Sequence, residues 1–381
     1  MKKINLLIAF LLTSILTFSQ ASLAEIDGPE GKVQLKIQLP RDYEANADTM
    51  YPVIVVLDGD YLFNPIAGIV DYYSYWDEMP DAIVVGIKQL ETKENDFLCD
   101  DLNGLPDGTG AAFFEFVTLE LFNFLDNNYR TVPFRIIAGH GESANFLNFY
   151  LFQEKPFFNG YISLSPSFTP KMEVRLKEQL EATENDIFYT LATAEDDRKK
   201  SKNSIASLHG QLKTISNELF HYNYNYFPKK SHYELVAHSI PSAIENIFEK
   251  YKPISKREYK EEILGYDEGT AYDYLVKKYE TIETLYGIEK QIRLNDFNAA
   301  EAAIKKNEDW EALELLGKLA KKEYPETMLG LYYIAQFYEN TEEPKKAMKA
   351  YQNAFTMEPI GRLTKDDMLH YADMIKADFG Y

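Results

Sequence analysis

A glycine-rich turn near the middle of the chain carries the clearest sign of chemistry. The apolar run at residues 134–138 passes directly into Gly139-His140-Gly141-Glu142-Ser143, and residues 146–152 follow with the pattern of a buried helix. A strand, a sharp glycine-rich turn and a helix together form a nucleophile elbow, which presents an attacking side chain at the edge of an α/β sheet. The chemistry expected of such an element is acyl transfer, which also needs a histidine base, an orienting carboxylate and donors to an oxyanion.

A mainly parallel α/β sheet is predicted around this turn. From residue 31 to about residue 251, short apolar runs alternate with amphipathic stretches. Residues 33–39 alternate apolar and polar side chains, which predicts a half-buried, antiparallel opening strand. Residues 111–127 have the spacing of a helix. Continuous apolar runs, typical of strands buried on both faces, occur at residues 52–57, 82–87, 134–138, 161–164, 187–193 and 223–227.

The last third of the chain has a different composition. Beyond Pro253 it is rich in Ala, Leu, Lys and Glu and contains no strand-like runs, which predicts an all-α domain at residues 253–381 after an α/β domain at residues 25–252. Small and aromatic residues near residues 328–361 match a tetratricopeptide repeat, namely Ala335, Tyr338, Ala347, Tyr351, Ala354 and Pro359. We expect this region to dock or dimerise, with a groove for a protein partner as the alternative.

The N-terminus is typical of a secretory signal. Lys2 and Lys3 precede an apolar run at residues 4–18, and small residues follow up to Ala24, so a signal peptide is predicted at residues 1–24. The run falls short of the ~20 residues that span a bilayer, so no stable membrane anchor is expected. These features predict a periplasmic or secreted protein.

Charge and motifs exclude several classes of function. The 381 residues include 40 basic and 60 acidic side chains, and the resulting charge of −20 repels nucleic acids and anionic lipids. Cys99 is the only cysteine, so it cannot form an internal disulfide. Phosphate-binding, dinucleotide-binding, zinc-protease and EF-hand motifs do not occur, so no organic cofactor and no metal are predicted.

Five segments carry a resemblance to a known family: Tyr51-Pro-Val-Ile-Val-Val-Leu57-Asp58-Gly59, Ile83-Val-Val-Gly-Ile87, Tyr129-Arg-Thr131, Gly139-His140 and Ile162-Ser-Leu-Ser-Pro166. In these segments and in their order along the chain, residues 31–250 resemble the esterase D / enterochelin esterase family of α/β hydrolases. The resemblance implies an α/β-hydrolase fold, hydrolysis of a carboxylic ester and a small-molecule ester as the ligand.

The chain departs from this family at the nucleophile. Family members read Gly-His-Ser after the strand, and Gly141 stands where the serine is expected. Glycine suits the strained turn but provides no attacking atom. Ser143 is the alternative nucleophile, because Gly141-Glu142-Ser143-Ala144 is similar to the elbow of carboxylesterases. An elbow centred on Ser143 would place Asn145, rather than a small residue, two positions further on, so the register favours Gly141.

The resemblance also implies the other members of a catalytic triad. His232 follows a predicted strand and precedes the last helix of the α/β domain, where this family has its general base. Glu195, at the end of the run that starts at Ile187, is the implied orienting acid, with Asp196 or Asp197 as substitutes. The order nucleophile, acid, histidine is that of α/β hydrolases.

Two backbone N–H groups are expected to form an oxyanion hole. One follows the elbow, at Glu142, and the other lies on the loop after an early strand, at Asp60 or Tyr61. An anionic side chain at Glu142 is unfavourable beside a developing oxyanion. Two functions follow from these residues: an extracytoplasmic esterase that uses Ser143, Glu195 and His232, or a catalytically silent relative that binds a ligand.

Overall fold

The computed structural model describes residues 21–380, which divide into two compact units between Glu249 and Lys250. The sequence predicts this boundary three residues later, between residues 252 and 253. The signal peptide predicted at residues 1–24 lies almost wholly outside the described residues, and the first strand begins at Ser22.

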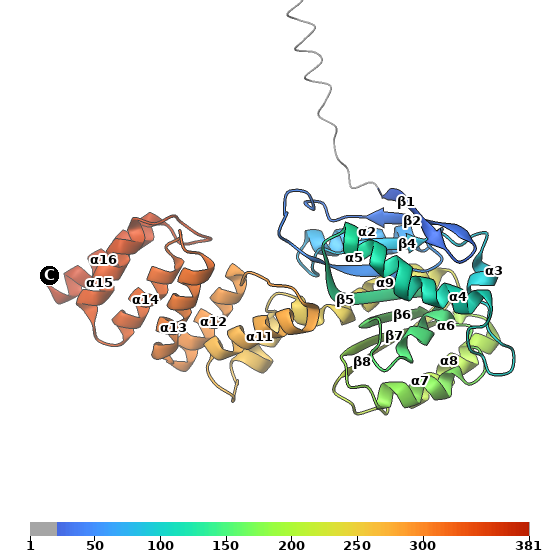
Figure 1. The fold of residues 1–381 in the computed structure, drawn as a ribbon. Helices are drawn as coiled ribbons and strands as arrows, with labels where there is room; N and C mark the ends of the chain where they lie inside the picture. The colour runs from blue at the N-terminus through green and yellow to red at the C-terminus, as the bar shows by residue number, and fades with distance from the viewer. Residues whose placement is uncertain (1–20, 381) are drawn as a thin grey trace, which may run out of the picture. The chain divides into compact units, whose positions relative to one another are not determined.

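The first unit is built on a twisted sheet that contains eight strands within the described residues (Figure 1). Their spatial order is β1-β2-β4-β3-β5-β6-β7-β8, and every pair from β4 to β8 is parallel. The predicted fold class, an α/β hydrolase with a mainly parallel sheet, is confirmed. The strands are β1 (Ser22–Gly28), β2 (Gly31–Gln38), β3 (Tyr51–Val56), β4 (Ile83–Ile87), β5 (Thr131–His140), β6 (Gly160–Leu164), β7 (Ile187–Asp196) and β8 (Phe220–Ser231).

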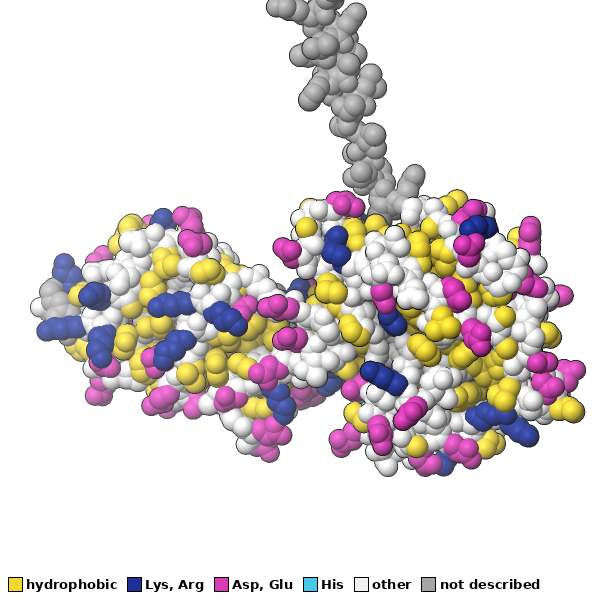
Figure 2. All heavy atoms as spheres, viewed as in Figure 1, with side chains coloured by type: hydrophobic (Ala, Val, Ile, Leu, Met, Phe, Trp, Pro, Cys, Tyr) yellow, Lys and Arg dark blue, Asp and Glu magenta, His cyan; other side chains and the backbone are white. Residues whose placement is uncertain are grey.

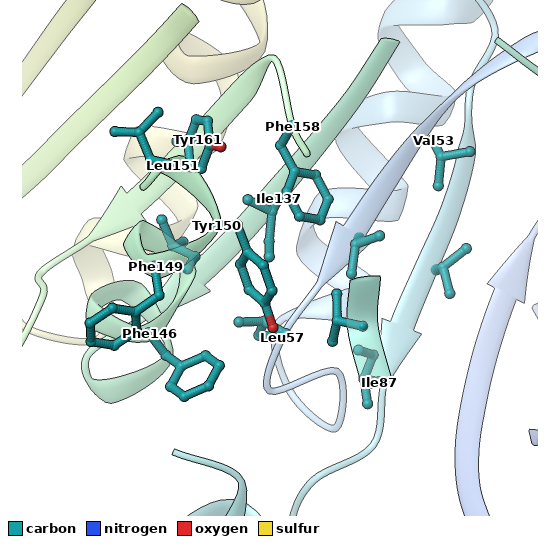
Figure 3. Close-up of a cluster of buried hydrophobic side chains, with 14 of the residues drawn as sticks. Val53, Leu57, Ile87, Ile137, Phe146, Phe149, Tyr150, Leu151, Phe158 and Tyr161 are labelled. Atoms are coloured by element: carbon teal, nitrogen blue, oxygen red, sulfur yellow. The ribbon is translucent and has the colours of Figure 1, made fainter. Parts of the chain in front are cut away.

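The central strands β3, β4 and β6 are fully buried because helices cover both faces of the sheet. Successive side chains of β3 point to opposite faces, so that Val53 and Val55 join one core while Ile54 lies on the other side. Figure 3 shows part of the first core, in which Ile137 lies beside Tyr150 and Phe158, and Val53 belongs to the same cluster of buried side chains. This packing fixes the strand ends that carry the polar residues of the site.

The helices of this unit are short and several are interrupted. The predicted helix at residues 111–127 is observed as two α-helical segments joined by a π turn at Val117–Leu121. The helices α2 and α9 contact each other. The helices are α2 (Phe63–Tyr75), α3 (Lys93–Asp96), α4 (Thr109–Phe116), α5 (Phe122–Asn128), α6 (Glu142–Phe146), α7 (Met172–Glu181), α8 (Lys199–Leu212) and α9 (Glu234–Ile247), with a 3₁₀ turn at Leu147–Leu151.

The second unit consists of helices in which each contacts the next along the chain. The helices α13 and α14 approach closely at Gly317 and Gly330, where a side chain on Gly317 would come within 2.8 Å of the Gly330 carbonyl. The predicted tetratricopeptide-like segment contains α14 and α15, with Ala335, Ala347 and Tyr351 buried. The helices are α10 (Lys256–Glu258), α11 (Ala271–Tyr286), α12 (Leu294–Asn307), α13 (Trp310–Glu323), α14 (Leu329–Asn340), α15 (Pro344–Phe355) and α16 (Lys365–Phe379).

Figure 2 shows acidic side chains scattered over the visible face of each unit, with apolar side chains between them. Among residues 21–380, none of the helices has both the length and the apolar character that a membrane crossing requires.

Candidate active site

The turn after β5 has the geometry of an elbow, and Gly141 is its central residue. Gly141 joins β5 to α6 with φ of 69° and ψ of −111°, a conformation that favours glycine. Gly139 closes the turn, because a methyl group there would lie 2.6 Å from the backbone carbon of Ser143. The residue at the tip of this elbow is therefore a glycine, which has no side chain to present.

His232 and Asp197 form a hydrogen-bonded pair across from the elbow. His232 follows β8, Asp197 follows β7, and Nδ1 of the imidazole lies 2.9 Å from Oδ1 of the carboxylate. A carboxylate only accepts, so Nδ1 carries a proton, and in the neutral imidazole Nε2 is the nitrogen with the free lone pair. A methyl group built on Gly141 would lie 4.0 Å from Nε2, and apart from its chain neighbours it would meet no other heavy atom of residues 21–380 within 4 Å. The basic nitrogen thus faces the place where an elbow serine would carry its hydroxyl.

Ser165 completes this arrangement and was not identified from the sequence. It follows β6, the strand between β5 and β7, and it is fully buried with a positive φ of 47°. Its hydroxyl donates to Oδ2 of Asp197 at 2.5 Å and lies 2.9 Å from Nδ1 of His232. The Ser-Pro pair after a buried strand is the only sequence signal that could have indicated it.

Asp197 is held as an anion by these contacts. Burial alone would raise the pKa of its carboxyl, but hydrogen bonds from His232, Ser165, Thr193 and the Arg198 backbone lower that pKa to about 2. A carboxylate that stays charged fixes the tautomer and orientation of its imidazole partner.

Glu195, the acid implied by the family resemblance, does not contact His232. Its carboxylate accepts a hydrogen bond from the Lys229 backbone at 2.7 Å, and its side chain is exposed. The register between β7 and β8 shifts between Ala194 and Asp196, so the side chain that turns toward the imidazole belongs to Asp197, the substitute. The position of the acid is corrected accordingly.

Ser143 is also not placed for attack. It is fully buried, its hydroxyl donates to Oδ2 of Asp58 at 2.7 Å, and its oxygen accepts from the His140 backbone at 2.8 Å. It has no hydrogen bond to His232, because two residues beyond the elbow the side chain points back beneath the turn. Ser143 therefore stabilises the turn from behind rather than presenting a nucleophile.

Asp58 and His140 belong to a second polar network behind the elbow. Lys93 Nζ lies 2.9 and 2.8 Å from the two Asp58 oxygens. Nε2 of His140 donates to the His232 carbonyl at 3.1 Å, which leaves Nδ1 to accept from the Tyr61 hydroxyl at 3.1 Å. Burial, and secondarily the neighbouring His232, lowers the pKa of His140 to about 4, so this imidazole is neutral near pH 7.

The two loops expected to supply oxyanion donors follow adjacent strands, β3 and β5. The N–H of Tyr61 donates to the Asp58 carbonyl at 3.2 Å and is therefore in use. The N–H groups of Asp60 and Glu142 donate to no acceptor within residues 21–380. Asp60 and Glu142 thus keep the donors that an oxyanion hole requires.

The arrangement contains a general base, its orienting acid and free backbone donors, but no nucleophile at the elbow. Among the described residues, no group of three or more His, Cys, Asp or Glu side chains is arranged to hold a metal ion. The site can accept and return a proton at Nε2 of His232, and it cannot form an acyl-enzyme through Gly141.

The strand order, the elbow and the chain order Gly141, Asp197, His232 define an α/β hydrolase. The model of the family described as "Putative esterase" matches residues 27–213. This match, which covers most of the α/β unit, supports an esterase-type hydrolase.

Solved structures share the fold to different extents. An uncharacterised protein from Capnocytophaga ochracea is 30% identical with a TM-score of 0.86, and the match covers 94% of this chain and 100% of that one. An IroE-like serine hydrolase from Shewanella oneidensis is 16% identical, with a TM-score of 0.59 over 80% of this chain and 99% of that one. The BES protein from Bacillus cereus is 21% identical, with a TM-score of 0.52 over 61% and 96%. No curated protein matches the chain.

Proposed function

We propose that this chain is an esterase-family protein that has lost covalent catalysis and retains recognition of a small ester or related carbonyl ligand. The observation that supports this most strongly is Gly141 at the tip of the elbow, facing Nε2 of His232. An acyl-enzyme needs an oxygen or sulfur atom at that place, and glycine has neither.

The retained residues support ligand recognition. Asp197 and Ser165 hold the His232 imidazole, whose side chain is 11% exposed, and the N–H groups of Asp60 and Glu142 are free to meet a carbonyl oxygen. A ligand whose carbonyl oxygen accepts from these donors can also place its carbonyl carbon toward Nε2 of His232.

The competing function is an esterase that attacks through Ser143. This mechanism would have to break the bond from Ser143 to Asp58, bring a fully buried hydroxyl to the surface and move it to His232. Leaving Asp58 without this donor costs about 1–3 kcal/mol, because it is a buried charged acceptor. The hydrogen bond that holds the buried Ser143 hydroxyl on Asp58 therefore favours ligand binding without an acyl-enzyme.

Restoring the missing hydroxyl tests the proposal. We expect Gly141→Ser to react with a fluorophosphonate probe at residue 141 and to show an acyl-enzyme burst with p-nitrophenyl acetate. The wild-type chain should remain unlabelled, and Ser143→Ala should not change this result. Mass spectrometry of the labelled peptide identifies the site. A covalent adduct on any residue of the wild-type protein would contradict the proposal.

We also propose that the protein is exported and that its helical unit binds a protein partner. The signal-like residues 1–24 support export to the periplasm or the medium. The helical unit, with its tetratricopeptide-like segment, supports a protein partner, whereas the charge of −20 argues against nucleic acid. Fractionation of cells that express the full chain tests the first point.

A further inference from the structure

The elbow leaves room for a reactant that the chain itself does not supply. Within the described part of the chain, a methyl carbon on Gly141 would meet only Nε2 of His232 at 4.0 Å, apart from its chain neighbours. An oxygen atom beside Gly141 can therefore lie within hydrogen-bond reach of Nε2, about 2.6–3.2 Å. Because glycine has no side chain, a water molecule fits where an elbow serine would hold its hydroxyl.

The base is prepared to take a proton from that water. Asp197 accepts from Nδ1 at 2.9 Å, and Ser165 donates to the other oxygen of the same carboxylate at 2.5 Å. The His140 side chain donates to the His232 carbonyl at 3.1 Å, so the backbone of the base is held as well. These contacts hold the imidazole with Nε2 toward Gly141. The ring therefore does not have to rotate before Nε2 accepts a proton.

We infer that the protein hydrolyses activated esters directly, with His232 as a general base toward water and without a covalent intermediate. This inference rests on the proposed function, in which the site binds a carbonyl ligand without forming an acyl-enzyme. It adds a reaction, and the ligand class is an ester with a good leaving group, such as an aryl ester.

The step is balanced with water as the only co-reactant. The water oxygen forms a bond to the carbonyl carbon while one water proton passes to Nε2, and the carbonyl oxygen becomes an oxyanion near the Asp60 and Glu142 N–H groups. The bond from carbon to the leaving oxygen then breaks, and Nε2–H returns the proton to that oxygen. The products are the carboxylic acid and the alcohol.

The rate should be modest. Serine hydrolases stripped of their triad keep about 10³–10⁴-fold acceleration over water through binding and oxyanion donors. A retained general base adds to this, since positioned proton transfer contributes about 10²–10⁴-fold.

Steady-state hydrolysis of p-nitrophenyl acetate by the purified full chain tests the inference. We expect wild-type turnover above the buffer rate with no burst, and a decrease of about 100-fold or more in His232→Ala and His232→Gln. His370→Ala, on the exposed face of α16, is the matched control for the loss of an imidazole and should keep the wild-type rate. Wild-type turnover equal to buffer, or equal in His232→Ala, overturns the inference.

Gly141→Ala provides a second and independent variant. Its methyl carbon, 4.0 Å from Nε2, would crowd a water oxygen held within hydrogen-bond reach of that nitrogen, so turnover should fall as it does in His232→Ala. Gly210→Ala, where a methyl group meets no atom within 4 Å, is the matched control and should keep the rate. Unchanged turnover in a folded Gly141→Ala protein, verified by circular dichroism, also overturns the inference. Fluorophosphonate labelling of the wild-type chain would contradict the proposed function instead, so the two failures are distinguishable.

Discussion

His140 is a buried imidazole whose neutral state is tied to folding. Its ring lies 4.2 Å from that of His232, and its exposed fraction is 3%. Its pKa is about 4 in the folded protein, below the ordinary value near 6.5, because burial and the neighbouring imidazole disfavour the cation. Below pH 6.5 the unfolded chain therefore binds a proton that the folded chain does not.

The stability that His140 contributes should decrease with falling pH. It is fully present above about pH 6.5 and is lost as the pH falls through 4. We expect the free energy of unfolding in urea to fall more steeply from pH 7 to pH 4 in wild type than in His140→Gln. The exposed His370→Gln should follow the wild-type curve. Parallel curves for wild type and His140→Gln would show that His140 does not titrate in this way.

The residues of the site were only partly predictable from the sequence. Gly141 and His232 could be located because each follows a strand of recognisable pattern. Asp197 required the register shift at the end of β7, which no apolar pattern reveals. Ser143 attracts attention because of its place in a glycine-rich turn, and only its contact with Asp58, 85 residues away in sequence, shows its structural role.

At the scale of elements, the elbow depends on a close approach between the end of β5 and the start of α6. A methyl group on Gly139 would lie 2.6 Å from the Ser143 backbone carbon and 2.8 Å from the Ala144 nitrogen, so backbone atoms would have to move. We expect Gly139→Ala to lower the free energy of unfolding by about 3 kcal/mol through overpacking.

Gly210 provides the opposite case within a helix. It lies in α8 with no neighbour within 4 Å of an added methyl group. Gly210→Ala should raise stability by about 0.5–1 kcal/mol, because alanine restricts the unfolded chain and favours the helix. Urea unfolding of both variants measures the two effects. A Gly139→Ala protein as stable as wild type would mean that the elbow tolerates a wider turn.

The strands were more predictable than the helices because strand burial leaves continuous apolar runs. All six predicted apolar runs overlap observed strands, from β3 to β8. The first strand, β1, was missed because its residues 22–28 mix polar and apolar side chains and overlap the predicted signal segment. The π turn within the helix at residues 111–127 was not predicted, because the apolar residues Phe113, Val117, Leu121 and Phe124 fit the spacing of a continuous α-helix.

At the scale of the whole molecule, the chain consists of two compact units, and the Capnocytophaga structure matches across 94% of it. The helical unit is therefore a shared part of this architecture rather than an isolated extension. Each unit has its own buried side chains, so each is expected to unfold as a cooperative unit.

Asp296 gives a way to perturb the helical unit alone. It is fully buried, its carboxylate accepts from the Ile254 backbone at 2.9 Å and from the Tyr279 hydroxyl at 2.8 Å, and all three residues belong to this unit. Asp296→Ala leaves these two donors without their acceptor, which should cost the helical unit about 2–4 kcal/mol. Asp373→Ala, an exposed carboxylate on α16, is the matched control and should change stability by less than about 0.5 kcal/mol.

Hydrogen exchange followed by mass spectrometry distinguishes the two units in one experiment. In Asp296→Ala, amides of α12 should exchange faster by about 30-fold or more, the factor that corresponds to about 2 kcal/mol. Amides of β5, in the α/β unit, should keep their wild-type rates, because none of the lost contacts reaches that unit. Equal acceleration in β5 and α12 would show instead that the units unfold together, and that the helical unit contributes directly to the stability of the site around His232.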